Sequence, residues 1–257
     1  MSVAAPLGGF HHVTMIAGNP APNVAFYREG LGMRLVKKTV NFDDPKSYHL
    51  YYGDEAASPG SLFTFFAWPG AVPGQRGVGE ITKIGLRAPG VGGSDPDGLQ
   101  VEVGRGRTRI ESIEMTVADR GATVDFMTSL LGFELQMDGA LRLGEATVAV
   151  VEDRGGARGR QSAGSVHHVA WSVPSDEVEL EWQLSLRAAG VDVTPVRDRQ
   201  YFHSIYFREP GGVLFEIATD APGFAIDESP EHLGEKLMLP AWMEPDRQRI
   251  EAELPPI

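Results

Sequence analysis

The sequence predicts an α+β fold made of four tandem βαβββ units, of which the second is truncated. Two observations lead to this prediction. Residues 10–14 (FHHVT) return as residues 166–170 (VHHVA), and residues 10–35 match residues 110–135 at an offset of 100 without a gap. In the matched segments the apolar residues recur first at the period of a strand and then at that of a helix, so both element types repeat.

The first unit sets the order of the elements. Residues 10–17 alternate as a strand, and a helix is expected to start at Pro22 and Asn23. Val24, Tyr27 and Leu31 then lie on one helical face. Three strands follow, at residues 33–40, 47–53 and 61–68.

The fourth unit repeats this order. A strand at 166–173 leads to Pro174-Ser175-Asp176, and Glu179 stands where a capping box with Asp176 requires it. The helix has Val178, Trp182 and Leu186 on one side. Strands are expected at residues 191–196, 202–208 and 212–219, with a hairpin turn at 209–212.

The second unit keeps only its first and last strands. Residues 83–89 match 168–174 and residues 95–103 match 209–217, but only residues 90–94 lie between them, too few for a helix. The predicted organisation is 9–108 for units one and two, 109–222 for units three and four, and 223–257 for a tail that wraps the body. In the tail, helices are expected near 231–237 and 245–254, with apolar anchors at Leu237, Met238, Leu239 and Trp242.

Composition narrows the function. A net charge of -12 argues against nucleic acid and anionic membranes as partners, since both would repel the chain. There is no cysteine, so any metal must be held by nitrogen and oxygen atoms. Neither a signal peptide nor a membrane span is evident, so a cytoplasmic location is expected. The sequence leaves open whether the protein forms a homo-oligomer.

Aligning the units locates a site. At the inward position of the first strand the units carry His12, Lys83, Ser112 and His168. At the matching position of the last strand they carry Thr64, Glu102, no acidic residue in unit three, and Glu216. Units one and four therefore hold two His and one Glu between them. Strand alternation predicts that His11 faces away from His12.

Two His and one carboxylate on one side of an octahedral metal leave three open positions, a set that favours Fe(II), with Mn(II) as the alternative. A single His on a strand is more often a packed, hydrogen-bonded side chain, but the equivalent placement in separate repeats favours ligands. Lys83 and Glu102 are expected to form a salt bridge in a unit with no site, or to be simply two exposed charges.

At these residues the chain resembles the vicinal oxygen chelate superfamily, and within it the hydroquinone ring-cleaving dioxygenases. The likeness runs from Gly9 to the end and includes residues 35–43 (LVKKTVNFD), 48–54 (YHLYYGD) and 239–242 (LPAW). It implies that the units form two curved mixed sheets around a metal site. The departure is the shortened second unit, which relatives have complete.

The resemblance implies Fe(II) held by His12, His168 and Glu216, with His11, Thr14, Arg199 and Tyr206 around it as catalytic residues. Its substrates would be O2 and a small aromatic diol of the hydroquinone, or catechol, type. His49 and His203 are candidates for lining the substrate pocket.

Two other functions stay open. A metal-dependent, glyoxalase-like isomerase or lyase would need no O2 but often a fourth protein ligand, which Thr64 disfavours. A metal-free binding protein of the same fold is disfavoured by the intact set of ligands.

Overall fold

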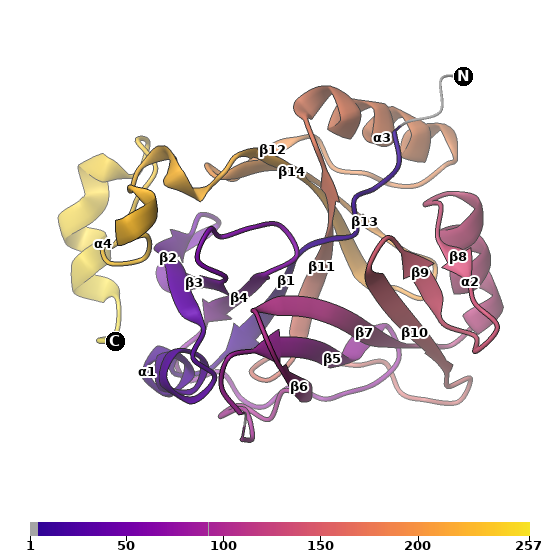
Figure 1. Cartoon of the computed structure of the whole chain (residues 1–257), viewed down its shortest axis with the longest axis horizontal. Helices are drawn as coiled ribbons and strands as arrows, with labels where there is room; N and C mark the ends of the chain where they lie inside the picture. Colours follow the sequence, from indigo (N-terminus) through magenta and orange to yellow (C-terminus); the bar gives the residue numbers. More distant parts are fainter. Residues whose placement is uncertain (1–4, 92) are drawn as a thin grey trace.

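The computed structural model describes residues 5–91 and 93–257. Two curved mixed sheets form the body, so the predicted fold class is confirmed (Figure 1). The larger sheet has eight strands in the order β12-β13-β14-β11-β1-β4-β3-β2. They are β1 (Phe10–Ala17), β2 (Arg34–Asn41), β3 (Asp44–Gly53), β4 (Leu62–Ala67), β11 (Val166–Val173), β12 (Arg197–Asp198), β13 (Phe202–Arg208) and β14 (Leu214–Pro222).

The smaller sheet has six strands in the order β6-β5-β7-β10-β9-β8. They are β5 (Glu80–Ala88), β6 (Val101–Arg105), β7 (Arg109–Val117), β8 (Glu134–Leu135), β9 (Leu141–Leu143) and β10 (Ala146–Glu152). Units one and four form the larger sheet and units two and three the smaller one. Each sheet therefore joins one unit from residues 9–108 with one from residues 109–222.

Within each unit the first strand pairs in parallel with the last. Thr14 pairs with Thr64 in unit one, and Ala170 with Glu216 in unit four. In unit two the corresponding pair is Gly85 and Glu102. These pairs lie two residues after His12, His168 and Lys83, so the register confirms the alignment of the units.

The helices start differently from the prediction. Helix α1 (Pro20–Val24) begins two residues early, because the Asn19 side chain accepts the N–H of Ala21, and it continues as a π-helix, η1 (Ala25–Gly30). Helix α2 (Arg120–Ser129) belongs to unit three. Helix α3 (Asp176–Ala188) has Ser175 as its N-cap and no side-chain cap bond, so the predicted capping box is wrong. Its Glu179 is buried instead, with a 1% exposed side chain.

The truncation of unit two is confirmed. Strands β5 and β6 pair directly, and the described residues between them, 89–91 and 93–100, contain no helix. The strand expected at residues 191–196 is wrong: only an isolated bridge between Val193 and Phe207 forms there, and β12 starts at Arg197.

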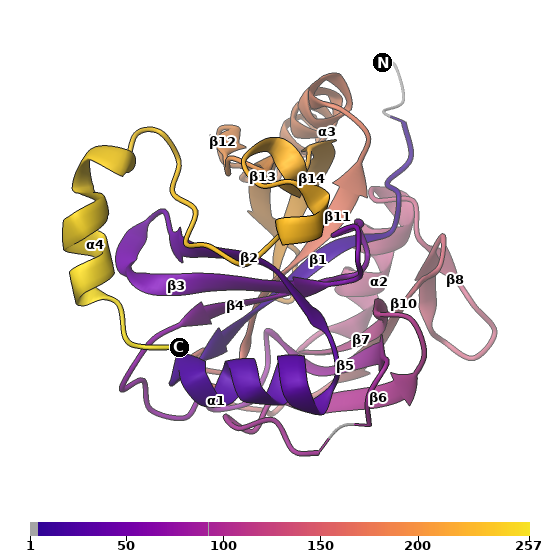
Figure 2. The ribbon, with the colours of Figure 1, turned by 60° about the vertical axis from the view of Figure 1, so that its left-hand side comes forward.

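The tail is less helical than predicted. Residues 231–237 do not form a helix; three 3₁₀ turns occur instead, η2 (Phe224–Ile226), η3 (Pro230–His232) and η4 (Glu244–Asp246). Helix α4 (Arg247–Glu253) falls within the expected 245–254. Leu239 is buried, as an anchor should be. Trp242 is 52% exposed, and its ring contacts the Phe42 ring edge-on. The tail runs beside β2, where Lys38 and Leu237 form a bridge (Figure 2).

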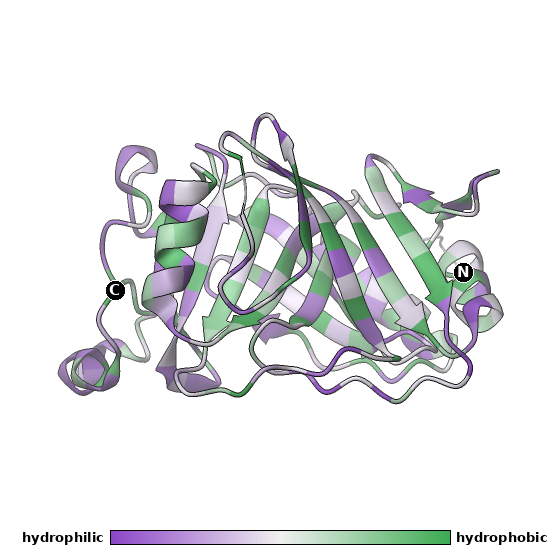
Figure 3. Ribbon diagram, turned by 90° about the horizontal axis from the view of Figure 1, so that it is seen from below, coloured by the Kyte–Doolittle hydropathy of each residue, from purple (hydrophilic) through white to green (hydrophobic). Residues whose placement is uncertain are grey.

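The core lies where the two sheets and the helices meet. Hydrophobic and hydrophilic residues alternate along the strands, as the two faces of each sheet require (Figure 3). Among the described residues, no helix combines the length and the apolar character needed to cross a bilayer.

Candidate metal centre

The centre is built on the antiparallel pairing of β1 with β11, the middle strands of the larger sheet. This pairing contains two register shifts, one between Phe10 and His12 and one opposite Thr14 and Met15. On β11 the second shift passes over His167. Each His-His pair therefore sits at a β-bulge, where one strand carries an extra residue.

Three polar atoms converge between the strands. The Nε2 atoms of His12 and His168 lie 3.3 Å apart, and Glu216 Oε2 lies 3.3 Å and 2.9 Å from them. All three side chains are buried, and they form the one group of potential metal ligands found among the described residues.

A metal ion fits this group on two counts. Ligand atoms bound at right angles, about 2.1 Å from one ion, lie about 3 Å apart, close to the separations observed. Glu216 Oε2 is also buried without a hydrogen-bond partner among the described residues, an arrangement that is costly unless a cation compensates it. The Oε1 atom accepts a hydrogen bond from Ser204 Oγ, so the carboxylate is held with Oε2 toward the two imidazoles.

The prediction that His11 faces away from His12 is wrong. The Nδ1 atoms of the two rings lie 2.8 Å apart, and the same contact joins His167 to His168 at 2.7 Å. The bulges cause this, because an extra residue in one strand interrupts the alternation of faces. Sequence reasoning left His167 without a role, and here it occupies the place that His11 has on β1.

We call His12 and His168 the inner imidazoles and His11 and His167 the outer ones. The contacts between them bear on which nitrogen of each inner imidazole carries the proton. Burial, and then the neighbouring His12, lower the pKa of His11 to about 3, and burial lowers that of His167 to about 3, so both are neutral. The Glu216 charge and the backbone of Thr219 oppose this lowering of the His11 pKa without reversing it. In the tautomer in which the neutral His11 Nδ1 accepts from His12 Nδ1–H, the His12 Nε2 lone pair is directed at the centre, as a metal ligand requires.

Thr64 occupies the position that is equivalent to Glu216. Its Oγ1 lies 2.8 Å from Thr14 Oγ1 and 3.0 Å from His49 Nε2. The other ring nitrogen of His49 lies 2.8 Å from the Tyr51 hydroxyl. Thr14 therefore reaches the pocket only through Thr64 and His49, and unit one supplies no carboxylate here.

A cavity of about 310 Å³ opens onto the two His. That volume is at the small end for ligand sites. Aromatic and aliphatic side chains form much of its wall, and a few polar groups converge in it. The lining residues are His12, Asn41, Phe42, Asp43, His49, Tyr51, Phe66, Trp68, His167, His168, Arg199, Phe202, Tyr206 and Leu214.

Arg199 and Tyr206 meet in the wall of this cavity. Arg199 Nε donates to the Tyr206 hydroxyl at 3.1 Å, and Arg199 Nη1 donates to Asp43 Oδ2 at 3.0 Å. Burial and the nearby Glu216 charge raise the pKa of Tyr206, so its phenol stays protonated. A protonated phenol that already accepts a bond can still donate its own proton to a ligand.

The structure does not bring His203 to this pocket. Its Nδ1 lies 2.7 Å from Asp176 Oδ1 at the start of α3, and its neighbour Phe202 lines the cavity instead. Strand alternation accounts for the difference, because Phe202 and His203 face opposite sides of β13. Lys83 and Glu102, by contrast, form the salt bridge expected of them, at 3.2 Å.

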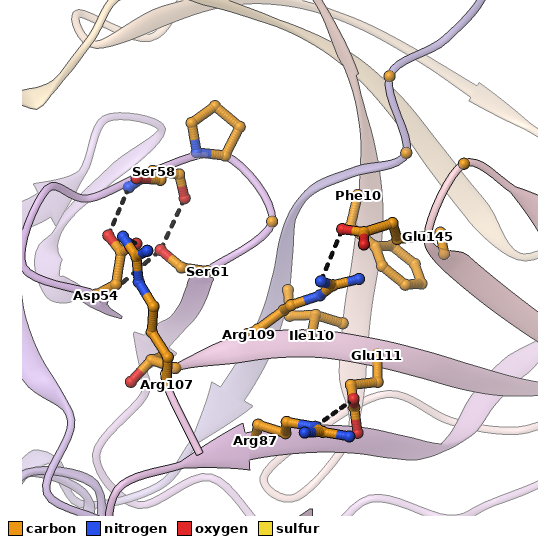
Figure 4. A pocket seen from close by; sticks show the side chains of 17 residues that line it. Phe10, Asp54, Ser58, Ser61, Arg87, Arg107, Arg109, Ile110, Glu111 and Glu145 are labelled. Carbon is orange, nitrogen blue, oxygen red and sulfur yellow. Dashed lines mark hydrogen bonds and ion pairs between the residues drawn. The ribbon is translucent and has the colours of Figure 1, made fainter.

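A larger cavity, of about 770 Å³, lies away from the three ligand atoms (Figure 4). It is rimmed by Arg87, Arg107 and Arg109, but each of these guanidinium groups is already paired, with Glu111, Asp54 and Glu145 respectively. The rim charges thus cancel. The smaller cavity, with buried and convergent polar groups, is the better candidate for chemistry.

Sequence reasoning missed several residues of the site. Ser204 and the aromatic wall formed by Phe66, Trp68 and Phe202 carry no motif, and Asp43 ends the stretch 35–43 that carries the resemblance but had no role assigned. Phe66 lies on β4 and Phe202 and Ser204 on β13, next to the strands of the ligands, while Trp68 directly follows β4 and Asp43 lies in the turn after β2. These places become informative once the sheet order is known.

Comparison with known proteins agrees with this geometry. The family model described as the Glyoxalase/Bleomycin resistance protein/Dioxygenase superfamily matches residues 9–69 and 109–217. The unmatched stretch between them contains the shortened second unit. MhqO of Bacillus subtilis, named as a ring-cleaving dioxygenase, is 39% identical over 301 residues, covering 96% of both chains. That alignment is longer than the 257 residues of this chain, so the relative has residues that this chain lacks.

Two further matches cover nearly the whole chain. A crystal structure of a Bacillus subtilis protein, named as a dioxygenase, has a TM-score of 0.90 and 36% identity and covers 99% of this chain and 98% of its own. The chlorohydroquinone/hydroquinone 1,2-dioxygenase of Sphingobium indicum is 28% identical over 298 residues, covering 92% of each chain.

Proposed function

We propose that this chain, which belongs to the Glyoxalase/Bleomycin resistance protein/Dioxygenase superfamily, is an Fe(II)-dependent dioxygenase that cleaves the ring of hydroquinone-type aromatic diols with O2. The observation that carries the proposal is the convergence of His12, His168 and Glu216 at one buried point, with Thr64 where a fourth ligand would stand. The names of the relatives support the reaction and the substrate class.

His12, His168 and Glu216 would hold the metal, for which Mn(II) is the alternative. Two imidazoles and one carboxylate suit a divalent iron that keeps open positions. Bound there, Fe(II) would supply the electron transfer that lets O2 react with an electron-rich ring. His11 and His167 would keep the inner imidazoles in the tautomer that offers Nε2 to the metal, through the Nδ1–Nδ1 contacts.

The pocket residues would bind and orient the diol. The flat side chains of Phe66, Trp68 and Phe202 give an apolar slot for one aromatic ring. The Tyr206 phenol is protonated and can donate to a substrate oxygen. Arg199, whose guanidinium contacts that phenol, would stabilise negative charge on the same oxygen.

A para diol can place only one oxygen on the metal, so its second hydroxyl needs a partner in the pocket wall. His49 has both ring nitrogens engaged, with Thr64 and Tyr51, so it shapes the wall and holds that network in place. Arg199 and Asp43, which are joined by a hydrogen bond, are polar groups of the lining that can meet the second hydroxyl.

Anaerobic reconstitution with Fe(II), followed by oxygen uptake with hydroquinone, methylhydroquinone and catechol, tests the proposal. We expect uptake with the hydroquinones. Protein that contains iron but consumes no oxygen with any of the three would refute it. An isomerase or lyase of the same superfamily would work without O2, and Thr64 in place of a fourth carboxylate argues against it.

A further inference from the structure

Lys37 is a buried cation to which the proposed function assigns no role. It lies on β2 with a side chain that is 0% exposed, and its Nζ is 2.6 Å from both Asp227 Oδ1 and Glu228 Oε2. Both carboxylates belong to the tail, which Figure 1 shows lying against β2. Removing three charges from water is expensive, and apolar packing of the same volume is often as stable. Stability alone therefore does not explain this cluster.

The cluster holds one aromatic side chain in place. The Tyr201 hydroxyl donates to Asp227 Oδ2 at 2.9 Å, and Lys37 Nζ lies 4.9 Å from the centre of the Tyr201 ring. The Tyr201 ring also stacks on Phe224, at 4.9 Å between centroids. We call Lys37, Asp227, Glu228 and Tyr201 the Lys37 cluster. Tyr201 is fully buried in it and is fixed at its hydroxyl and at its ring.

Tyr201 is joined to Arg199 by a strained turn. The Tyr201 N–H donates to the Arg199 carbonyl at 2.8 Å, and Arg199 N–H donates to the Phe202 carbonyl at 2.9 Å. Between them Gln200 has a φ of 70°, in the left-handed region. A three-residue turn of this kind around a residue other than glycine persists only where its surroundings enforce it. The anchored Tyr201 side chain is the buried part of those surroundings.

The turn sets where the Arg199 side chain begins. From there Arg199 reaches both the Tyr206 hydroxyl and Asp43 Oδ2. A guanidinium that donates to two acceptors on different elements, one on β13 and one in the turn between β2 and β3, tolerates little movement of its backbone. Loss of the Tyr201 anchor should therefore displace Arg199 in the pocket and leave the three metal ligands in place.

We propose that the Lys37 cluster positions Arg199 for substrate binding, with Tyr201 as the positioning residue and the tail as the source of the two carboxylates that hold the cluster. This inference rests on the proposed function only in assigning substrate binding to Arg199. The effect of the cluster on the Arg199 turn can be measured without any turnover.

The test uses Tyr201→Phe and Lys37→Met in the full chain, with Lys38→Met as the matched control. Tyr201→Phe removes one hydroxyl and leaves the Lys37 ion pairs, so it decides the question if Lys37→Met fails to fold. Lys38 is the next residue on β2, and its Nζ bonds only the Glu235 carbonyl among the described residues. The readouts are amide hydrogen exchange at residues 199–203, iron content, and the KM and kcat of the iron-loaded protein.

We expect faster exchange of the Arg199 and Tyr201 amides in both variants, an unchanged iron content, and a KM for hydroquinone raised about tenfold with a smaller change in kcat. Adding Tyr201→Phe to Arg199→Ala should raise KM no further, since the two act on one contact. Wild-type exchange in both variants, or additive effects on KM, would overturn the proposal. If the wild type turns over no diol, the dioxygenase assignment fails while the exchange result still decides the positioning role.

Discussion

The Nδ1 atom of His11 lies 2.8 Å from the Nδ1 atom of His12, although the two residues are neighbours on one strand. A β-bulge makes this possible, and the corresponding bulge on β11 gives His167 and His168 the same contact. The pairs come from units that are 156 residues apart, so the arrangement is a property of the repeat. Each inner imidazole has an outer one that fixes its orientation.

Replacing His11 with Phe is expected to weaken Fe(II) binding by about 10-fold to 100-fold. Phe keeps the ring that packs on Phe202 but removes the acceptor for His12 Nδ1–H. Competition with a coloured iron chelator measures the affinity. His203→Phe is the control, because it removes an imidazole that bonds Asp176 outside the pocket. Equal iron affinity in wild type and His11→Phe would contradict the role given to His11.

Glu216→Gln is expected to abolish metal binding and to stabilise the metal-free protein by about 1–3 kcal/mol. The carboxylate is 0% exposed, and its Oε2 has no hydrogen-bond partner among the described residues, whereas an amide N–H can donate to either Nε2. Thermal unfolding with and without Fe(II), under anaerobic conditions, measures both effects. Metal should raise the Tm of the wild type only.

Glu102→Gln is the matched control for that experiment. Glu102 holds the equivalent register position in unit two but is exposed and paired with Lys83. We expect it to leave both the metal response and the metal-free Tm nearly unchanged. A metal response retained by Glu216→Gln would remove Glu216 from the ligand set.

The repeat made the ligands predictable, because a strand register is periodic and carries a position from one unit to another. His12, His168 and Glu216 could be aligned in the sequence, and the pairs Thr14–Thr64 and Ala170–Glu216 show the same register in space. The truncation of unit two was readable for the same reason. The chain between its two strands is too short to form the helix that the other units have.

What the sequence did not reveal depends on contacts between distant segments. A bulge depends on the partner strand, so the inward turn of His11 and the part played by His167 had no local signal. The tail lacks a period, and its fixed points, such as Asp227 on Lys37, are single long-range contacts. His203 was misplaced because its neighbour Phe202 takes the inward position.

Thr64→Glu is expected to convert an open site into a closed one. Thr64 stands where unit four has Glu216, so a carboxylate there would provide a fourth protein ligand from β4. Metal affinity should be kept or increased, while oxygen uptake with hydroquinone falls at least about tenfold, because fewer open positions remain for substrates. Iron content and oxygen uptake are measured on the same sample.

Thr64→Val separates this effect from the loss of the threonine hydroxyl. That hydroxyl contacts Thr14 and His49, so Val removes the network without adding a ligand. We expect Thr64→Val to keep a larger share of the oxygen uptake than Thr64→Glu. If both variants lose activity equally, the network matters and the open position does not.

Glu80 makes the stability of the fold depend on pH. The side chain is 4% exposed, and its Oε1 has no hydrogen-bond partner among the described residues. Burial raises the pKa of Glu80 from 4.5 to about 7, against the opposing effect of Arg158 and Arg76. The folded state thus binds the proton more tightly than the unfolded chain. The resulting stabilisation is complete below pH 4.5 and is lost as the pH rises through about 7.

Glu80→Gln should therefore remove part of the loss of stability at high pH, since an amide has no charge to bury. We expect the variant to be more stable than the wild type by about 1–2 kcal/mol near pH 8, with little difference near pH 5. In a chain of this size that is a Tm difference of about 2–6 °C. Glu134→Gln, which removes an exposed carboxylate, should change the Tm at neither pH. A Tm difference between Glu80→Gln and wild type that is the same at both pH values would show that Glu80 does not titrate in this range.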